Sequence, residues 1–540
     1  MRIMKSFFKV IFSRYFISAL LILIEIALIL FAVIYASAYS AIALVAMGIV
    51  NLLAFLSLVN KETTPEYKVS WMFVLLAVPL FGSVIYLMFY SRRLTRTEAN
   101  LMRGIYSRLE RDLELATEKV SSLSSCGVED GTRVAKCAIN SPFGMDDEDG
   151  LADPLALGKI KAIMNDDILA EPYKRTSLDY FSTGEAMFSA MIEDISRAER
   201  FVFLEYFIID RGEMLDTLID SLAAAARRGV EVRLLFDDFG CMRTLPEDFP
   251  KQLSALGITA MRFSPIAPKA AAEHNNRDHR KICIVDGVKA FTGGINIADE
   301  YINKKERFGH WKDGGVRVFG DAARGFVKLF LSLWDFTSGK VSDPKPYLVS
   351  SGSISSDGGI YVPFGSGPAP IYQRSVGKNA FLNIINQSRD YVYITTPYLV
   401  IDYDLTEALC NAALRGVDVR IVTPGIADKK LVKIMTKSAY SHLMSSGVRI
   451  YEYVPGFMHE KLVISDGEYA IVGTINFDFR SLAHHFEDAV WMFRAPAIGD
   501  IKEEYMRVLS VSELCGKGRA TLSFGERILA AAIRIFAPLL

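Results

Sequence analysis

The sequence of 540 residues lacks the features that identify several common protein classes. Its six cysteines are scattered and form no Cys-x-x-Cys pair, so neither a disulfide framework nor a cysteine-based zinc cluster is expected. It has no basic excess, because 61 Lys and Arg residues face 62 Asp and Glu residues, and this argues against nucleic acid as a partner. With 51% apolar and 23% charged residues the composition excludes a disordered chain, and the length predicts several domains.

Charge is missing altogether from a long stretch near the start of the chain. No charged residue lies between Glu25 and Lys61, and the apolar stretch Tyr15–Val59 is about twice the ~20 residues that one helical crossing needs. A secretory signal peptide is the alternative, but its apolar region is shorter and a small-residue cleavage site follows it. We therefore predict a membrane anchor of two or three transmembrane helices over residues 1–92. The candidate helices are Tyr15–Ala36, Ala41–Val59 and Val69–Tyr90.

Two similar halves make up the chain from residue 171 onward. Each half contains an apolar strand, a helix and a second strand, and the second strand is introduced by Arg-Gly-Val-acid-Val-Arg at Arg228 and again at Arg415, 187 residues later. Strand, helix and strand joined by short turns form a βαβ unit. The sequence therefore predicts an α/β fold made of a duplicated unit, in which each half holds a largely parallel sheet with helices on both sides.

Both halves carry the same polar motif, His-x-Lys-x4-Asp, with an Asn that follows the His by 17 residues. On a strand, His and Lys two residues apart point to the same face, so both side chains can reach one site. A lone His is more often a buried structural residue, but a doubled motif in register with a repeat indicates catalysis. The motif residues are His279, Lys281, Asp286 and Asn296 in the first half and His459, Lys461, Asp466 and Asn476 in the second.

The doubled motif resembles the signature of the phospholipase D superfamily, in which two such motifs meet across a pseudo-twofold axis and build one active site. Other segments resemble the bacterial cardiolipin synthases within that superfamily, and the resemblance covers nearly the whole chain. These segments are Phe203-Leu-Glu-Tyr-Phe, Asn275-Asn-Arg-Asp-His-Arg-Lys, Gly309-His-Trp-Lys-Asp, Gly365-Ser-Gly-Pro, Thr396-Pro-Tyr and Asn476-Phe-Asp-Phe-Arg-Ser.

These residue types suit attack on a phosphodiester. Such a substrate is anionic, so its site needs positive charge, a nucleophile and an acid for the leaving alcohol. Lys281 and Lys461 would supply the charge, and Asn296 and Asn476 would supply neutral donors. One imidazole would attack phosphorus while the other protonates the leaving oxygen, and an alcohol could then replace water as the acceptor. No metal and no cofactor are expected.

The resemblance also implies a carboxylate partner some 25–35 residues after each motif histidine. Asp313 follows His279 by 34 residues and Glu487 follows His459 by 28, so we expect the pairs Asp313–His279 and Glu487–His459. Asp286 and Asp466 belong to the motif, and we expect them to hold the motif loops. His484 and His485 are expected in packing or surface positions rather than as metal ligands.

The function that the resemblance implies is transfer of a phosphatidyl group between two phosphatidylglycerol molecules, giving cardiolipin and glycerol through a phosphatidyl-histidine, with His279 as the nucleophile. The alternative is a membrane-bound phospholipase D that uses water as the acceptor and gives phosphatidic acid. Either enzyme would be a multi-pass protein of the bacterial plasma membrane with phosphatidylglycerol and membrane lipid as partners. The catalytic part is expected in the cytoplasm, although basic residues at both ends of the anchor leave the orientation open. A homo-oligomer is compatible with this function.

Five segments follow from these considerations. They are a membrane anchor (1–92), a juxtamembrane helix and connector (93–170), a first and a second phospholipase D-like repeat (171–345 and 346–515), and a C-terminal amphipathic helix (516–540).

Overall fold

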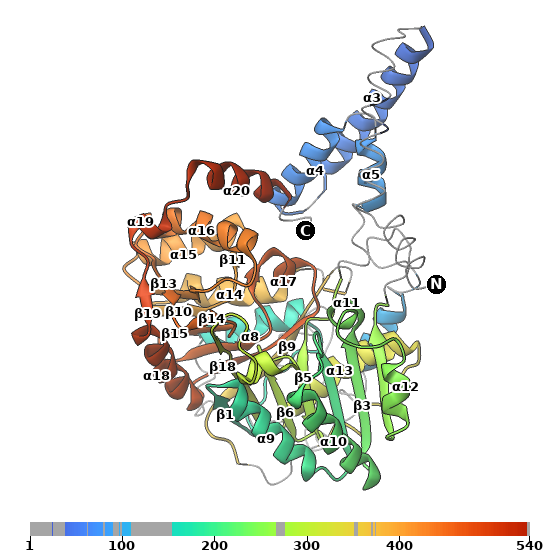
Figure 1. The fold of residues 1–540 in the computed structure, drawn as a ribbon. Coiled ribbons are helices and arrows are strands. Elements are labelled where there is room, and N and C mark those ends of the chain that lie inside the picture. Colours follow the sequence, from blue (N-terminus) through green and yellow to red (C-terminus); the bar gives the residue numbers. More distant parts are fainter. Residues whose placement is uncertain are drawn as a thin grey trace, which may run out of the picture. The chain divides into compact units, whose positions relative to one another are not determined.

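A computed structural model describes most of the chain, and its helices and strands are labelled in Figure 1. The described residues are 24, 27, 38–61, 63–78, 81–89, 97, 100–109, 154–265, 276–349, 355–368, 371–372 and 374–536. They divide into two compact units. One unit lies within Met1–Arg93 and Phe524–Leu540, and the other within Leu94–Ser523 without residues 266–275.

The first unit is helical and corresponds to the predicted anchor together with the last helix. Helix α3 (Ala38–Val59) contains the predicted span Ala41–Val59. The prediction of one helix over Val69–Tyr90 is wrong, because the chain forms α4 (Pro65–Ala77) and α5 (Gly82–Phe89) instead. The residue before a proline disfavours the helical conformation, and α4 ends just before Val78, which precedes Pro79.

A small core holds the first unit together. Leu58, Trp71 and Tyr86 are buried, and the rings of Trp71 and Tyr86 meet edge to face at 5.4 Å. Helix α20 (Phe524–Phe536) belongs to the same unit, and its Phe536 ring lies 5.5 Å from Phe73 of α4. No helix among the described residues is both long enough and apolar enough to span a membrane. Apart from Ile24 and Ala27, the candidate span Tyr15–Ala36 lies outside the described residues, and so do residues 110–153.

The second unit consists of two sheets of the same design, one from each repeat. The first has the order β1-β8-β6-β5-β2-β3-β4, and the second has the order β9-β18-β16-β15-β10-β12-β13 with β19 added at its edge. The strands of the first sheet are β1 (Thr176–Phe181), β2 (Phe201–Tyr206), β3 (Glu231–Asp237), β4 (Ile258–Phe263), β5 (Lys281–Val285), β6 (Lys289–Gly293) and β8 (Gly315–Gly320). Those of the second are β9 (Ile360–Ser366), β10 (Tyr391–Thr395), β12 (Asp418–Pro424), β13 (Arg449–Tyr453), β15 (Leu462–Ser465), β16 (Tyr469–Gly473), β18 (Glu487–Phe493) and β19 (Ser512–Leu514).

The duplicated α/β fold is confirmed, but the prediction of largely parallel sheets is wrong. Among the described strands of the two large sheets, only β2-β3-β4 and the equivalent β10-β12-β13 run parallel, and these include the strands of the βαβ pattern. The strands that carry the motifs, β5 and β15, pair antiparallel with β2 and β10, and the remaining strands of each sheet are antiparallel too. Short connections such as that between β5 and β6 permit only antiparallel pairing, because a parallel pair needs a long crossover.

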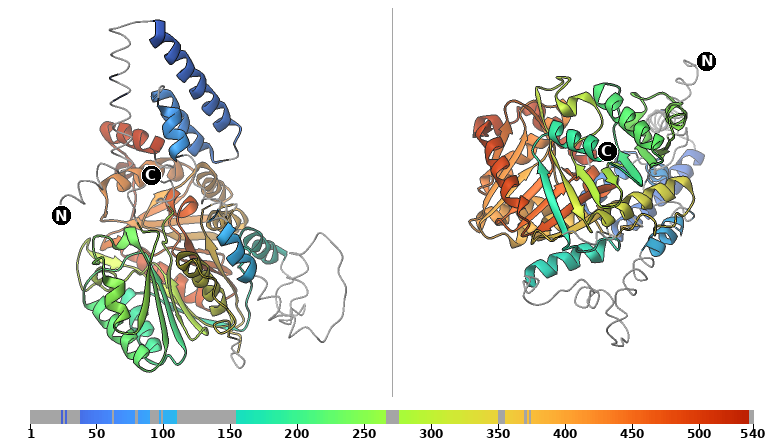
Figure 2. Two further views of the ribbon diagram at one scale, coloured as in Figure 1. Left: turned by 90° about the vertical axis from the view of Figure 1, so that its right-hand side faces the viewer. Right: turned by 90° about the horizontal axis from the view of Figure 1, so that it is seen from below.

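Helices cover both faces of the first sheet, as the left panel of Figure 2 shows. In β2, Val202 and Leu204 face a core shared with α9 and α10, whereas Phe201 and Phe203 face the core that contains α13. The second sheet is covered in the same way. The helices of this unit are α8 (Pro154–Asp166), α9 (Gly184–Ser196), α10 (Glu213–Arg227), α11 (Asp238–Cys241), α12 (Phe249–Ser254), α13 (Ala323–Ser338), α14 (Val376–Gln387), α15 (Tyr403–Leu414), α16 (Lys430–Ser445), α17 (Phe479–Ala483), α18 (Ala497–Ser510) and α19 (Lys517–Ala520).

The two repeats are joined by backbone pairing at the place where the motifs begin. The short strands β7 (His310–Lys312) and β14 (Gly456–Met458) pair in parallel, one from each repeat. At the position related by the pseudo-twofold axis, Asp278 and Phe486 form an isolated β-bridge, which is also parallel. Each segment that leads into a motif histidine therefore lies beside a strand of the other repeat.

Candidate active site

The two motif histidines occupy equivalent positions in the two repeats. His279 lies two residues before β5, and His459 lies three residues before β15. Both side chains are almost buried, with exposed fractions of 8% and 7% for the two residues. Only a small part of each imidazole is therefore open to a substrate.

Each histidine binds a carboxylate of the other repeat. His279 Nδ1 lies 2.9 Å from Glu487 Oε2, and His459 Nδ1 lies 2.6 Å from Asp313 Oδ2. The predicted pairs Asp313–His279 and Glu487–His459 are wrong, although all four residues are at the site. The amide of His279 donates to the Phe486 carbonyl and that of His459 donates to the Lys312 carbonyl, both at 2.8 Å. This pairing between repeats brings each histidine next to the carboxylate of the other motif.

The two carboxylates are supported in different ways. Glu487 accepts a hydrogen bond from the Thr474 hydroxyl, and Asp313 accepts one from the Gly314 amide. Gly294 stands at the position equivalent to Thr474, and a Cβ there would lie only 2.0 Å from Asp313 Oδ1. Gly294 is therefore required for the close approach of Asp313, and the two halves of the site are similar but not identical.

The two motif lysines lie at the same site and are buried. Lys281 Nζ donates to the His279 carbonyl at 2.7 Å, and Lys461 Nζ donates to the His459 carbonyl and lies 2.9 Å from His459 Nδ1. Burial lowers the pKa of both lysines, and that of Lys461 falls to about 7. Each lysine lowers the pKa of both histidines, so the four side chains form one electrostatic cluster.

The histidines are held in the neutral form. Burial, together with Lys281 and Lys461, lowers the pKa of His279 well below its usual value. Burial and Lys461 outweigh Asp313 and lower the pKa of His459 to about 4. Burial alone would raise the pKa of Asp313, but His459 and Lys461 reverse the effect and lower it. A neutral imidazole whose Nδ1 donates to a carboxylate has a free electron pair on Nε2, and this is the form that can attack phosphorus.

The motif asparagines differ in how they are bound. Asn296 Oδ1 accepts from the Ile208 amide at 3.0 Å, and its Nδ2 donates to the Tyr301 hydroxyl at 2.6 Å. Asn296 therefore ties the loop after β2 to Tyr301, with its Oδ1 and one of its two N–H donors engaged. Asn476 is buried, and its Oδ1 has no hydrogen-bond partner within the part of the chain that the structure describes.

The motif aspartates stand at the far ends of β5 and β15 and bind backbone amides. Asp286 accepts from the amides of Glu199, Arg200 and Phe201, where β2 begins. Asp466 accepts from the amides of residues 389–391 in the same way, at the start of β10. These bonds agree with the expectation that both aspartates hold the motif loops.

Comparisons with known proteins were made with this geometry in hand. The family described as "Cardiolipin synthase, PLD-like domain" matches residues 191–308 and 381–509, and "Phospholipase_D-nuclease N-terminal" matches residues 49–89. A cardiolipin synthase of Alkalihalophilus pseudofirmus is 30% identical over 88% of this chain and 89% of its own length. The chain belongs to the cardiolipin synthase family of the phospholipase D superfamily.

Two further comparisons extend this result. An uncharacterized protein of Streptococcus mutans serotype c is 42% identical over 68% of this chain and 79% of its own length. Among solved structures, phosphatidylserine synthase from Haemophilus influenzae aligns with a TM-score of 0.53 at 14% identity, over 67% of this chain and 93% of that one. This last likeness supports the fold.

In this member of the cardiolipin synthase family a third histidine stands at the site, and the sequence-based expectation of a packing or surface position missed it. The ring of His485 lies 5.4 Å from that of His279, and its Nδ1 lies 3.7 Å from Glu487 Oε1. Burial lowers the pKa of His485 to about 3. The signal was present in the sequence, because His485 and Glu487 are two residues apart and side chains at that spacing share one face of a strand.

His279, His485 and Glu487 together offer three potential metal-ligand atoms within 4.8 Å of one another. In the structure the carboxylate of Glu487 already binds the imidazole of His279 and the Thr474 hydroxyl. Two of the three groups are therefore already paired with each other, and metal-free chemistry stays a prediction.

Aromatic rings enclose both histidines. Phe207 lies 5.0 Å from His279, and Trp311, Tyr301 and Phe457 lie 5.2, 5.4 and 5.7 Å from His459, all measured between ring centroids. These rings exclude water from the sides of the imidazoles, which strengthens the charge interactions at the site.

Proposed function

We propose that the chain is a cardiolipin synthase that transfers a phosphatidyl group from one phosphatidylglycerol to another and releases glycerol. One observation supports this best: two histidines from different repeats, each oriented by a carboxylate of the other repeat, share one site with two buried lysines. Such a site offers a nucleophile, an acid and positive charge at the same phosphorus.

In the first half-reaction, His279 Nε2 attacks the phosphorus of the donor lipid. A P–N bond forms, the P–O bond to glycerol breaks, and His459 gives its proton to the departing oxygen. Glu487 stabilises the positive charge that develops on the His279 ring, because its carboxylate binds Nδ1 of that ring. The product of this step is a phosphatidyl-histidine and free glycerol.

In the second half-reaction, a hydroxyl of another phosphatidylglycerol attacks the same phosphorus. The new P–O bond forms as the P–N bond breaks, and the hydroxyl proton returns to His459. The two steps use one acid–base residue in opposite directions, so no external proton donor is consumed. Water in place of this hydroxyl would give phosphatidic acid.

The charges of the site fit an anionic substrate. Without a substrate, Lys281 and Lys461 keep both imidazoles neutral, since each lysine lowers the pKa of both histidines. A bound phosphodiester carries a negative charge that offsets the lysines and raises the pKa of His459, which prepares it to act as an acid. The lysines then stabilise the additional charge on the phosphoryl oxygens in the transition state.

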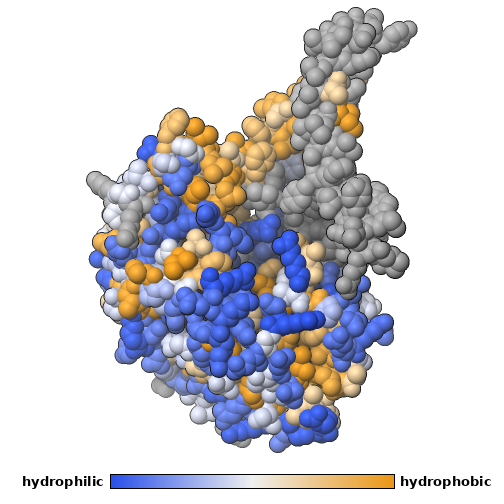
Figure 3. Space-filling model, viewed as in Figure 1, coloured by the Kyte–Doolittle hydropathy of each residue, from blue (hydrophilic) through white to orange (hydrophobic). Residues whose placement is uncertain are grey.

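We further propose that the first unit places the enzyme at the membrane that holds its substrate. Large apolar side chains are exposed on α3, α4 and α5, among them Leu53, Leu76 and Leu87, with exposed fractions of 61%, 71% and 69%. In Figure 3, hydrophobic residues gather over α4 and α20. Large exposed apolar patches mark protein or membrane contacts. A bacterial plasma membrane with the catalytic unit on the cytoplasmic side is the location that we propose.

A product assay on the purified protein tests the proposed reaction. With phosphatidylglycerol in mixed micelles, we expect cardiolipin and glycerol in equal amounts, and their formation should be lost in His279→Ala and in His459→Ala. Phosphatidic acid as the main product would identify a hydrolase instead. Near wild-type turnover in either variant would contradict the shared site.

A further inference from the structure

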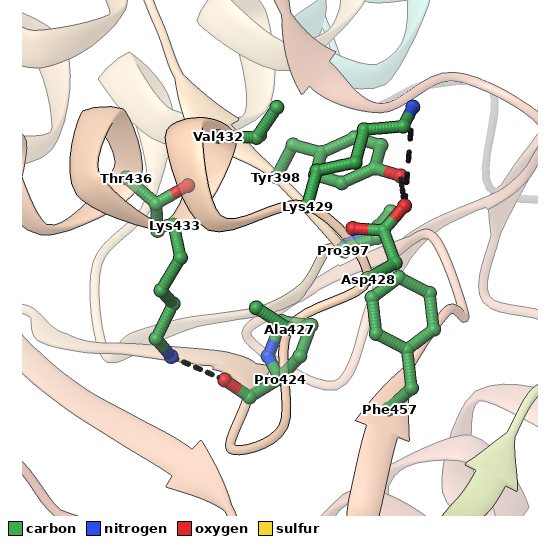
Figure 4. A pocket seen from close by; sticks show the side chains of 10 residues that line it. All are labelled: Pro397, Tyr398, Pro424, Ala427, Asp428, Lys429, Val432, Lys433, Thr436 and Phe457. Carbon is green, nitrogen blue, oxygen red and sulfur yellow. Dashed lines mark hydrogen bonds and ion pairs between the residues drawn. The ribbon is translucent and has the colours of Figure 1, made fainter. Parts of the chain in front are cut away.

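A small, half-open hollow lies beside the active site in the second repeat. It is formed where the chain leaves the carboxyl ends of β10 and β12, by the start of α16, and by Phe457 of β14. Tyr398, Asp428 and Lys429 meet on one side of it, and Lys433 points to the carbonyl of Pro424 on the other (Figure 4). It is open to solvent, and its enclosed space holds no more than about one water-sized group, so a ligand would contact its rim.

One aromatic ring separates the hollow from the catalytic histidine of this repeat. Phe457 lines the hollow, and its ring centroid lies 5.7 Å from that of His459 and 4.8 Å from that of Trp311. The ring of Tyr398 lies 6.4 Å from Phe457 on the side of the hollow. The charge of Lys429 is also among those that lower the pKa of His279. A group in the hollow is therefore close to the phosphorus that both histidines would reach.

The hollow offers one carboxylate and one ammonium group. Asp428 Oδ2 accepts a hydrogen bond of 2.7 Å from the Tyr398 hydroxyl, which fixes the carboxylate. Asp428 Oδ1 has no hydrogen-bond partner among the residues that the structure describes. Lys429 Nζ lies 3.9 Å from Asp428, and its side chain is 66% exposed. Lys433, in contrast, is engaged by Glu452 at 2.6 Å.

The equivalent place in the first repeat is built differently. There β3 ends at Asp237, the counterpart of Pro424 at the end of β12. Asp237 accepts from the amides of Phe239, Gly240 and Asp278, and it lies 3.5 Å from Arg277. The two repeats thus have like catalytic groups but different surroundings. The two sides of the phosphorus can bind different groups only if their surroundings differ.

We propose that this hollow is the subsite for the glycerol headgroup, in which Asp428 accepts hydrogen bonds from glycerol hydroxyls and Lys429 binds the phosphate of the acceptor lipid. The inference rests on the proposed function and on His459 as the acid. The leaving oxygen and the attacking oxygen both lie opposite the nucleophile, on the His459 side. The subsite therefore holds the departing glycerol in the first half-reaction and the acceptor's headgroup in the second.

The test starts the reaction with a donor that has no glycerol headgroup. With phosphatidyl-p-nitrophenol, nitrophenol release reports formation of the phosphatidyl-enzyme, which then divides between water, free glycerol and phosphatidylglycerol. The products are phosphatidic acid, phosphatidylglycerol and cardiolipin. Their ratios are measured on active molecules only, so partial misfolding of a variant does not change them.

Two variants and one control give distinct expectations. Asp428→Asn should lower transfer to both glycerol and phosphatidylglycerol, relative to water, by about 10-fold or more, since a hydrogen bond to a charged group is lost. Lys429→Gln should lower transfer to phosphatidylglycerol by a similar factor but not transfer to free glycerol, which has no phosphate. Lys430→Gln, one residue further and exposed outside the hollow, should change neither ratio.

Three results would overturn the inference. If wild-type enzyme forms cardiolipin and both ratios stay unchanged in Asp428→Asn and Lys429→Gln, the subsite is elsewhere and the proposed function still stands. If wild-type enzyme forms only phosphatidic acid in the presence of phosphatidylglycerol, the proposed function fails and the subsite fails with it. An equal loss in Lys430→Gln would mean that charge near the membrane, and not the hollow, controls transfer.

Discussion

At the scale of single residues, the exchange of carboxylates between the repeats is the main property of the site. His279 depends on Glu487 and His459 depends on Asp313, so each motif histidine takes its carboxylate partner from the other repeat. A histidine that loses the acceptor at its Nδ1 also loses its orientation and the stabilisation of its charged form.

This exchange can be tested by removing one carboxylate at a time. We expect Glu487→Gln and Asp313→Asn each to lower kcat by about 100-fold or more, because the imidazole loses its oriented partner. The discriminating measurement is carbethoxylation of the imidazoles, mapped on peptides by mass spectrometry. Glu487→Gln should change the modification rate of His279 and leave that of His459, and Asp313→Asn should do the reverse. The opposite pattern would support pairing within each repeat.

The low pKa of Lys461 predicts a pH dependence. The Lys461 side chain, with a pKa of about 7, is charged below that pH and then stabilises the phosphoryl oxygens. This positive charge is lost as the pH rises above the pKa. We expect kcat/KM to fall as the pH rises through about 7. The fall in kcat should occur at higher pH, because a bound anion raises the pKa of Lys461.

Lys461→Arg separates this effect from others. The guanidinium stays charged at these pH values, so the alkaline fall in kcat/KM should move to higher pH, even if the rate is lower. An unchanged pH profile in Lys461→Arg would show that another group is responsible for the fall.

The sequence was sufficient to find the main residues of the candidate site but not to pair them. The doubled spacing selected His279, His459 and both lysines, and the structure places them in one cluster. The carboxylates were identified but assigned to the wrong histidines, because distance along the chain does not reveal pairing between repeats. His485 was missed although its spacing to Glu487 was visible in the sequence.

At the scale of strands and helices, the motif aspartates connect the end of one strand to the start of its neighbour. Asp286 and Asp466 follow β5 and β15 with positive φ angles of 56° and 57°, and their carboxylates bind the first amides of β2 and β10. The left-handed conformation favours Asp or Asn at these two positions, because both tolerate it better than most residues do. The hydrogen bonds to backbone amides require an acceptor, which the aspartate carboxylate supplies.

We therefore expect Asp286→Ala to destabilise the fold by about 1–3 kcal/mol, since backbone amides lose their acceptor. Asp286→Asn should cost less, because its amide oxygen can still accept and its backbone tolerates the positive φ. Thermal unfolding in detergent compares the stabilities of the two variants. The specific activity of the folded fraction should stay within a few-fold of wild type, and a complete loss of activity in folded Asp286→Asn would instead indicate a direct catalytic role.

The elements that sequence reasoning predicted well are those with strong local signals. The βαβ segments appear as β2-α10-β3 and β10-α15-β12, each with the predicted parallel pairing. The antiparallel remainder of each sheet was not predicted, because hydrophobic runs such as β5 do not specify the direction of their neighbours. The helix break before Pro79 was predictable from the proline and was overlooked because the stretch is uncharged.

At the scale of the whole molecule, the duplication creates one site that neither half holds alone. Each repeat supplies one His and one Lys and the carboxylate for the other repeat's histidine, so the site requires both repeats in register. The hollow at Asp428 then distinguishes the two sides of this site. With His279 as the nucleophile, the hollow lies beside the acid His459.

The covalent intermediate tests this account most directly. The enzyme is mixed with phosphatidylglycerol that carries a radioactive phosphate, denatured rapidly without acid to preserve the phosphoramidate, digested and mapped. We predict label on the peptide that contains His279, and loss of that label in His279→Ala. Label on the peptide that contains His459 would reverse the roles of the two histidines and remove the basis of the proposed subsite. Absence of label from both peptides during turnover would contradict the covalent mechanism itself.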